Sequence, residues 1–106
     1  MSSIDVSRIK LFQLRAFVAV ADSGSFGKAA LQLEMTQSAI SYAIGGLEEE
    51  LGVVLFSRGR KGATLTTVGL EMVNNAKYIL QNLDQLVQVA DRARGLETGR
   101  VRVAAI

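Results

Sequence analysis

The sequence predicts a mainly α-helical chain with three short helices, one small β-hairpin and a final long helix. Apolar residues recur at intervals of three and four along most of the 106 residues, which is the spacing of one helix face. There is no proline, and the 10 glycines gather at a few points, which favours long helices with sharp ends. The β-prone residues lie between positions 53 and 66, so the expected sheet is small.

Composition excludes several kinds of site. The chain has no cysteine and no histidine, so it lacks disulfides, the commonest zinc ligands and the commonest general base. No nucleophile–base pair or phosphate loop is evident, so we expect neither catalysis nor a cofactor in this chain. A net charge of +2 is compatible with nucleic-acid binding but does not establish it. No segment is long and apolar enough to span a membrane, so we expect a cytoplasmic protein.

Two short helices are expected first. An apolar stripe predicts a helix over about residues 11–22, which Ser23-Gly24 ends. A second helix is expected over about 25–34. Ser25 is suited to cap it, because its hydroxyl can accept a hydrogen bond from a free N–H of the first turn.

A third helix is expected over about residues 37–51, with Thr36 as its capping residue. Gly52 follows its last apolar position, where glycine adopts the left-handed conformation cheaply. Only Glu34 and Met35 separate Thr36 from the second helix. Two helices joined by so few residues cross steeply, which is the helix-turn-helix arrangement.

A β-hairpin is expected after the third helix. The run over 53–56 is apolar and β-prone, residues 59–62 form a turn with two basic residues, and 63–66 return as the second strand. The hairpin would form a wing beside the three helices. The sequence therefore predicts a winged helix-turn-helix.

A fourth and much longer helix is expected from Thr66 or Thr67 to about Arg94. Its apolar and small residues recur in alternating steps of three and four, a sustained heptad seam. A helix of this length spans roughly 40 Å, more than the width of the preceding domain. We therefore expect a long dimerisation helix that pairs with a second chain. The residues expected at this contact are Met72, Ala76, Ile79, Leu80, Leu83, Leu86, Val87 and Ala90.

Four motifs stand at fixed spacing along the first two thirds of the chain. They are Ser25-Phe26-x-x-Ala29-Ala30-x-x-Leu33, Thr36-Gln37-Ser38-Ala39-Ile40-Ser41-x-x-Ile44-x-x-Leu47-Glu48, Leu51-Gly52-x-x-Leu55-Phe56-x-Arg58 and Leu65-Thr66-x-x-Gly69. Together they closely resemble the N-terminal signature of LysR-type transcriptional regulators. The resemblance extends from about Leu14 to the glycines near the end of the long helix.

This resemblance implies a winged helix-turn-helix domain over 1–66 that binds double-stranded promoter DNA. It implies a linker helix over 67–95 that pairs two subunits antiparallel, with tetramers expected for the full-length protein. Residues 96–106, where Gly95 and Gly99 bracket a hinge, would form this hinge and the first strand of an effector-binding domain that is otherwise absent from this chain. That domain would sense a small-molecule co-inducer.

The recognition helix departs from the family's usual pattern. The positions after Ser41 and Ile44 are often basic in the family, and here they are Tyr42 and Gly45. No Lys or Arg occurs between Met35 and Ser57. The resemblance therefore implies a DNA-reading helix but does not transfer a recognised base sequence.

Candidate DNA contacts lie at the start of the third helix and on the wing. The amide of Gln37 can present a donor and an acceptor to adenine, at the helix end that enters the major groove. Tyr42 either packs on a thymine methyl or is a partly buried amphipathic side chain. The basic residues of the wing either meet phosphates or the minor groove, or belong to a solvated turn. The full set is Ser25, Thr36, Gln37, Ser38, Ser41, Tyr42, Arg58, Arg60 and Lys61.

Two features of the third helix have no assigned role in DNA binding. The run Glu48-Glu49-Glu50 would repel phosphates, so we expect it to point away from DNA, with Glu48 pairing with a basic residue of the wing. Gly45 and Gly46 each destabilise a helix interior by about 1 kcal/mol relative to alanine. They indicate either a close backbone approach to DNA or a tolerated surface defect.

Two alternatives to a LysR-type regulator remain open. One is a different winged-helix regulator, such as a molybdate-responsive repressor. The other is a protein-interaction module that has lost DNA binding, which the weak basic charge and a recognition helix without Lys or Arg allow. A gel-shift titration over salt separates the second alternative from DNA binding, because phosphate contacts make affinity fall steeply with salt.

Overall fold

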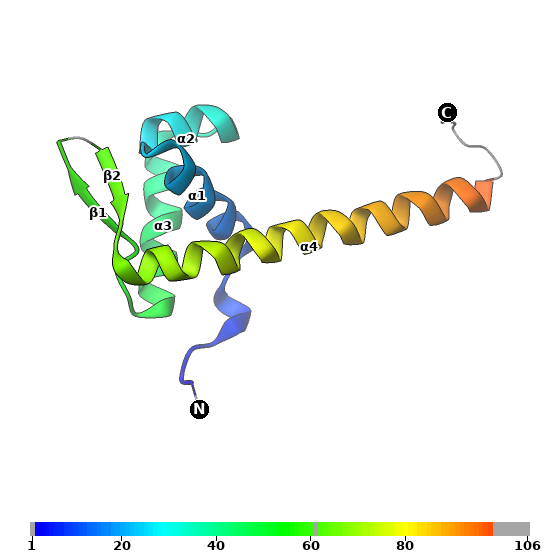
Figure 1. The fold of residues 1–106 in the computed structure, drawn as a ribbon, viewed down its shortest axis with the longest axis horizontal. Helices are drawn as coiled ribbons and strands as arrows, with labels where there is room; N and C mark the ends of the chain where they lie inside the picture. The colour runs from blue at the N-terminus through cyan, green and yellow to red at the C-terminus, as the bar shows by residue number, and fades with distance from the viewer. Residues whose placement is uncertain (1, 61, 99–106) are drawn as a thin grey trace.

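The computed structural model describes residues 2–60 and 62–98. Within these residues, α1, α2, α3 and a β-hairpin form a head from which the long helix α4 projects (Figure 1). The predicted fold class, a winged helix-turn-helix followed by a long helix, is confirmed. The elements are the 3-10 helix η1 (Val6–Arg8), α1 (Leu11–Ser23), α2 (Phe26–Leu33), α3 (Gln37–Leu51), β1 (Phe56–Gly59), β2 (Gly62–Leu65) and α4 (Thr67–Thr98).

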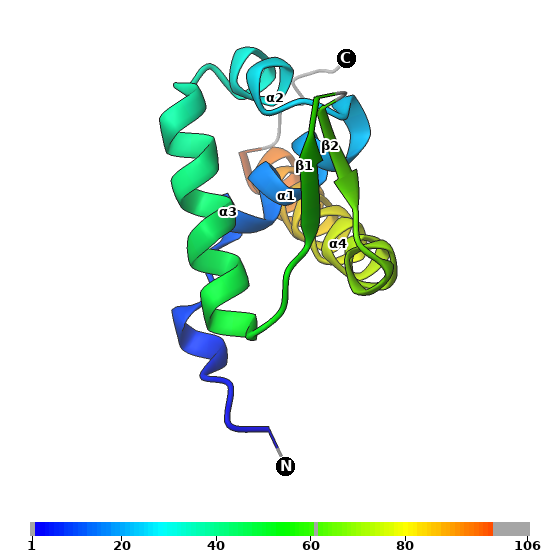
Figure 2. The ribbon, with the colours of Figure 1, turned by 90° about the vertical axis from the view of Figure 1, so that its left-hand side faces the viewer.

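The core of the head lies between α1, α2 and α3. Phe17 and Val20 of α1 and Ile40, Ile44 and Leu47 of α3 are fully buried. The residues on α3 follow the three-and-four spacing of one helix face, so burying them turns the opposite face of α3 outward. Figure 2 shows α3 at the outer edge of the head.

The predicted capping residues hold the helix ends. The Ser25 hydroxyl accepts a hydrogen bond from the Lys28 N–H at 3.1 Å, and the Thr36 hydroxyl accepts one from the Ala39 N–H at 3.0 Å. Gly52 ends α3 with φ of 70°, in the left-handed region. The turn between α2 and α3 is therefore short and fixed at both ends.

The hairpin begins later than the sequence predicts. Its antiparallel strands pair Phe56 with Leu65, so the apolar residues before Phe56 connect α3 to β1 and are not a strand. The reason is a carboxylate: Oε2 of Glu48 accepts hydrogen bonds from the N–H groups of Leu55 at 2.7 Å and Phe56 at 3.4 Å. The partners of Glu48 are these backbone amides, and among residues 2–60 and 62–98 it forms no ion pair with a basic residue of the wing, contrary to expectation.

Strand β2 is fixed to the turn between α1 and α2. The Ala63 N–H donates to the Gly24 carbonyl oxygen at 3.1 Å. A Cβ at Gly62 would lie 2.6 Å from that same oxygen, so only glycine allows this approach. The wing is thereby held beside the first turn of α2.

Helix α4 begins at a second hydrogen-bonded junction. The Thr66 hydroxyl accepts a hydrogen bond from the Gly69 N–H at 3.0 Å and donates to the Val54 carbonyl oxygen at 2.6 Å. The helix runs through Gly95 to Thr98, so it does not end near Arg94 as expected. The strand expected near the chain end lies outside the described residues.

Helix α4 has 32 residues, which at 1.5 Å per residue gives about 48 Å. An ion pair between Lys77 and Asp22, at 3.0 Å, joins it to the end of α1. Its length alone would suffice to cross a membrane. Even so, none of the helices over residues 2–60 and 62–98 is apolar enough over such a length to do so.

The apolar stripe of α4 divides into two flanks. Val73 and Ala76 face the head and are buried, with Ala76 only 2 % exposed. Ile79 and Leu86, in contrast, are 45 % and 66 % exposed. Ala76 is therefore covered within its own chain and does not offer the dimer contact expected of it. The reason is that α1 packs against the first turns of α4, so only the other flank and the distal turns stay open.

Removing the Glu48 carboxylate should destabilise the head. In Glu48→Ala, the N–H of the fully buried Leu55 loses its acceptor, which should lower the free energy of unfolding by about 1–3 kcal/mol. Chemical denaturation of wild type and variant measures this change. The exposed Glu49→Ala is the matched control and should stay within about 0.5 kcal/mol of wild type. Equal stability of all three proteins would show that the carboxylate does not hold the wing.

Candidate nucleic-acid interface

The outer face of α3 is a ridge of uncharged side chains that ends in one carboxylate. Ser38, Tyr42, Gly45 and Glu49 follow one another at helical spacing on this face, and all four are exposed. Tyr42 is 86 % exposed, so its expected alternative as a partly buried side chain is wrong. Gln37 begins the helix and is exposed as well.

A hollow of about 330 Å³, the wing-side hollow, lies between α3 and the wing. Its polar lining comes from Ser25, Gln37, Ser41 and Arg58. An ideal Cβ on Gly27 would lie 3.5 Å from the Gln37 side-chain oxygen, so the first turn of α2 meets the start of α3 here. Four of the predicted contact residues, from three separate elements, therefore meet around one hollow.

Arg58 gives the wing-side hollow its positive charge. Its guanidinium carbon lies 4.1 Å from the centroid of the Phe26 ring, a cation–π contact. The Phe26 ring in turn packs edge-on against Phe56, with the ring centroids 5.9 Å apart. Because the stacked guanidinium is held by its face, its N–H groups remain available at the edge.

A second hollow of about 680 Å³, the N-terminal hollow, lies on the other side of α3. Its walls come from the residues that lead into α1 and from the outer side of α3, including Lys10, Gln13, Tyr42, Gly45 and Glu49. Sequence reasoning missed this hollow. The residues before position 11 carry no motif, and only the folded chain brings them beside α3.

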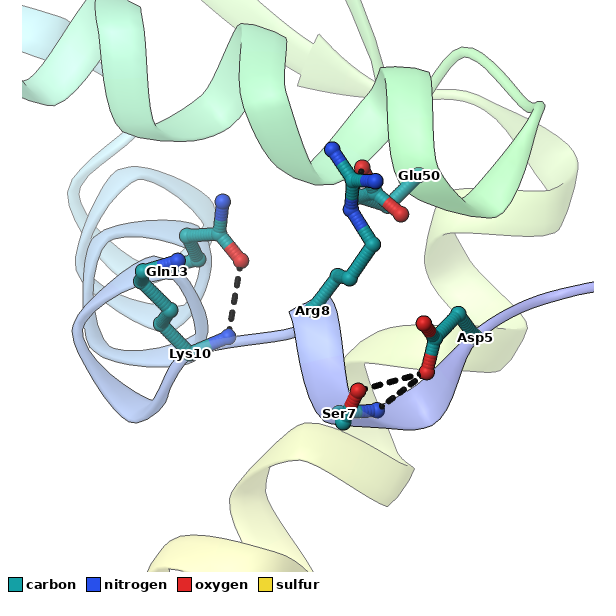
Figure 3. A network of polar contacts seen from close by, with 6 residues as sticks. All are labelled: Asp5, Ser7, Arg8, Lys10, Gln13 and Glu50. Atoms are coloured by element: carbon teal, nitrogen blue, oxygen red, sulfur yellow. Dashed lines mark hydrogen bonds and ion pairs between the residues drawn. The ribbon is translucent and has the colours of Figure 1, made fainter.

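A polar network holds the N-terminal segment against α3 (Figure 3). The Arg8 guanidinium forms an ion pair with Glu50 at 3.1 Å, and Oε1 of Gln13 accepts a hydrogen bond from the Lys10 N–H at 2.9 Å. The Arg8 charge is thus balanced by a carboxylate. Across residues 2–60 and 62–98, no ion pair involves the Lys10 ammonium, so Lys10 adds a free positive charge to this hollow.

The three glutamates of α3 do not act together. Glu48 binds the backbone of the wing and Glu50 binds Arg8, whereas Glu49 lies on the outer face in line with Tyr42. Helical spacing places Glu49 in line with Tyr42 and Gly45, so the outer face of α3 ends in a carboxylate. The expectation that this end of α3 points away from DNA stays a prediction.

The remaining predicted contact residues occupy the edges of the site. Thr36 caps α3, so its hydroxyl oxygen already accepts one hydrogen bond. Arg60 is exposed at the end of the hairpin, and Lys61 lies outside the described residues. Lys28, in the first turn of α2, is a further exposed cation. Sequence reasoning missed it because only α3 and the wing were searched for basic residues.

The arrangement fits a ligand that presents hydrogen-bonding and apolar groups to the ridge and carries negative charge on both sides of them. The ridge offers hydroxyl, amide and aromatic groups, which suit hydrogen bonding and apolar contact. Each flanking hollow carries a cation, Arg58 on one side and Lys10 on the other. Such a division between reading and positioning groups is typical of double-stranded nucleic-acid interfaces.

Comparison with known proteins gives a consistent result. The family model of the bacterial regulatory helix-turn-helix protein, lysR family, matches residues 11–70. The chain is 46 % identical over 96 residues to the probable HTH-type transcriptional regulator LrrA of Synechococcus elongatus, covering 91 % of this chain and 33 % of that protein. The chain thus spans about a third of the length of the curated relatives it matches.

Solved structures share both the fold and the sequence. The BenM DNA-binding domain in complex with catB site 1 DNA is 40 % identical with a TM-score of 0.77, covering 80 % of this chain and 96 % of that one. A Corynebacterium glutamicum OxyR mutant described as H2O2-bound is 35 % identical with a TM-score of 0.78, covering 83 % of this chain and 28 % of that one. With the family model matching more than half of its residues, the chain belongs to the LysR family of bacterial regulatory proteins and carries the family's helix-turn-helix DNA-binding domain.

Proposed function

We propose that this chain binds double-stranded promoter DNA sequence-specifically, as the N-terminal part of a LysR-type transcription regulator, with α3 in the major groove. The observation that carries the proposal is the ridge of α3 between its two hollows. A major groove about 12 Å wide admits one α-helix, and a sugar–phosphate backbone borders it on each side. The two backbones would lie over the wing-side and N-terminal hollows. The BenM DNA-binding domain, 40 % identical to this chain, is solved in complex with catB site 1 DNA, which supports DNA binding by a domain of this fold.

Base reading is assigned to the start and the ridge of α3. Gln37 is exposed at the helix N-terminus and can bond to an adenine through both its donor and its acceptor. Ser38 and Ser41 supply hydroxyl groups beside it. Because α3 carries no Lys or Arg, this reading relies on uncharged groups and close fit.

Affinity that is independent of sequence is assigned to the borders of the ridge. Arg58 and Arg60 on one side and Lys10 on the other would neutralise phosphates. The capped N-termini of α2 and α3 at Ser25 and Thr36 add partial positive charge. The sequence places Lys61 at the same turn, so it is included in this set as a prediction.

We infer that two chains pair through α4. The open flank of its stripe, with Met72 and Ile79, borders an apolar hollow of about 390 Å³ that Val6 and Ile9 also line. One head cannot cover the exposed distal turns, and a second α4 of the same pattern can. An antiparallel pair, as the family resemblance implies, would present two α3 ridges to one face of a pseudo-palindromic site.

We propose that this chain is the N-terminal part of a longer regulator. Its relatives are about three times as long, and an OxyR structure described as H2O2-bound is among the matches. We therefore assign sensing of a small-molecule co-inducer to a C-terminal domain, tetramer formation to the full-length protein, and the cytoplasm as its location. No catalytic role is proposed for this chain.

The lack of Lys and Arg in the recognition helix favours one other function, a protein-interaction module without DNA binding. Tyr42, at 86 % exposure, would serve such a contact as well. Salt dependence separates the two functions, because only DNA binding releases several counterions per complex.

Gln37→Ala should reduce discrimination at one base pair by roughly 1–3 kcal/mol, because a bidentate amide contact is lost. The measurement is competition binding on a duplex selected from a random library and on its single-base variants. Ser2→Ala, in the exposed N-terminal segment, is the control. An equal loss on the selected duplex and on random DNA would leave Gln37 only a positioning role.

Arg60→Ala and Lys10→Ala should each lower the slope of log affinity against log salt by about 0.9, one phosphate contact apiece. Gel-shift titrations between low and physiological salt give this slope. Arg92→Ala, on the exposed distal part of α4, is the matched loss of charge and should leave the slope unchanged. Wild-type slopes for both interface variants would contradict phosphate contacts at these borders.

Leu83→Lys should convert dimers to monomers, because it places a charge in the apolar seam at a cost of several kcal/mol. Sedimentation at micromolar concentration measures the change, and circular dichroism should show an intact head. Gln81→Lys adds the same charge about 200° around the helix and should remain dimeric. A monomeric wild type, or a dimeric Leu83→Lys, would contradict the pairing through α4.

A further inference from the structure

The middle of α3 contains two adjacent glycines, which destabilise a helix interior relative to alanine. The presence of glycine therefore needs an explanation at each of the two positions. The surroundings of Gly45 and Gly46 differ, and packing against neighbouring side chains explains only one of them.

Packing accounts for Gly46. It is half-buried, and a Cβ at this position would lie 3.0 Å from Nε2 of Gln13. Gln13 is held in place because its Oε1 accepts a hydrogen bond from the Lys10 N–H at 2.9 Å (Figure 3). A larger residue at 46 would push against this fixed amide and disturb the contact between α1 and α3.

Packing does not account for Gly45. A Cβ there would meet nothing within 4 Å, and the residue has no left-handed backbone that would require glycine. Alanine would therefore fit and would favour the helix. Gly45 lies on the outer face of α3, three residues after Tyr42 and four before Glu49, and it lines the N-terminal hollow.

We propose that Gly45 is a specificity-determining residue whose bare backbone receives a thymine methyl group, packed beside the Tyr42 ring. This inference rests on the proposed entry of α3 into the major groove. The C5 methyl is the apolar group that thymine presents there. Its partners on this face would be the aromatic ring of Tyr42, which is exposed, and the Cα of Gly45, which no side chain covers.

The charge beside Gly45 disfavours a phosphate directly over this residue. Glu49 stands one turn further along and is exposed, so a phosphate here would face its carboxylate at close range. A methyl group carries no such penalty. Because α3 itself carries no Lys or Arg, the cation that would balance a phosphate in the N-terminal hollow is Lys10. The sugar–phosphate backbone proposed over this hollow would therefore lie on its Lys10 side and not over Gly45.

Removing a methyl group from the DNA and adding one to the protein, separately and together, tests the inference. The probe is a duplex selected by the wild type from a random library, in which each thymine in turn is replaced by deoxyuridine to remove the C5 methyl. At one position, the wild type should lose about fourfold in affinity, the equivalent of one buried methyl group. Gly45→Ala should bind the thymine duplex roughly tenfold more weakly because of overpacking. It should recover on the deoxyuridine duplex, where the alanine methyl takes the vacated space.

Two controls make the result interpretable. Gly95→Ala also adds a methyl to an open helical position, in the distal part of α4, and should not alter DNA affinity. Thermal unfolding should show Gly45→Ala at least as stable as the wild type, which excludes misfolding. Unchanged affinity of Gly45→Ala, or a loss that no deoxyuridine substitution relieves, would overturn the inference while leaving the proposed function intact. A wild type that selects no sequence would overturn the proposed function and this inference with it.

Discussion

The backbone of Leu55 is the junction on which the rest of the structure depends. Its N–H is bound by the Glu48 carboxylate of α3 at 2.7 Å, and its carbonyl oxygen accepts the Thr66 N–H at 2.9 Å at the start of α4. Gly69 packs so closely on the same oxygen that no Cβ would fit. The Leu55 side chain is fully buried, so a lost partner would leave an unpaired polar group in the core, at about 1–3 kcal/mol. One residue thus joins the recognition helix, the wing and the long helix.

This junction links the proposed reading of DNA to the proposed pairing of chains. It fixes the wing relative to α3, and so sets where Arg58 stands beside the ridge. It also fixes the direction in which α4 leaves the head, and so would set the separation of two heads in the proposed dimer. With a net charge of only +2 and no cation on α3, the chain depends on shape and on placed charges at the borders of the ridge. In the proposed function, specificity would come from fit to the base edges more than from general attraction to DNA.

The helices, their caps and the fold class could be predicted from the sequence. The reason is that helix periodicity and capping hydrogen bonds depend on residues only a few positions apart. The errors arose where distant residues meet. The first strand was placed too early because Glu48, seven residues before Leu55, takes the amide that a strand would have used. Ala76 was assigned to a dimer although α1 already covers it. The N-terminal hollow was missed because Arg8 and Glu50 meet only in the folded chain. The part of the site that α3 and the wing supply was predictable, and the part that the chain start supplies was not.

The central claim is that the α3 ridge lies in a major groove with one sugar–phosphate backbone over each hollow. Hydroxyl-radical footprinting of the protein on a selected duplex tests it most directly. The account predicts protection on both strands that border one major groove, repeated about one helical turn away, roughly 10 base pairs, for the second head of a dimer. Protection of a single strand, or protection centred on the minor groove without a second site, would contradict the account.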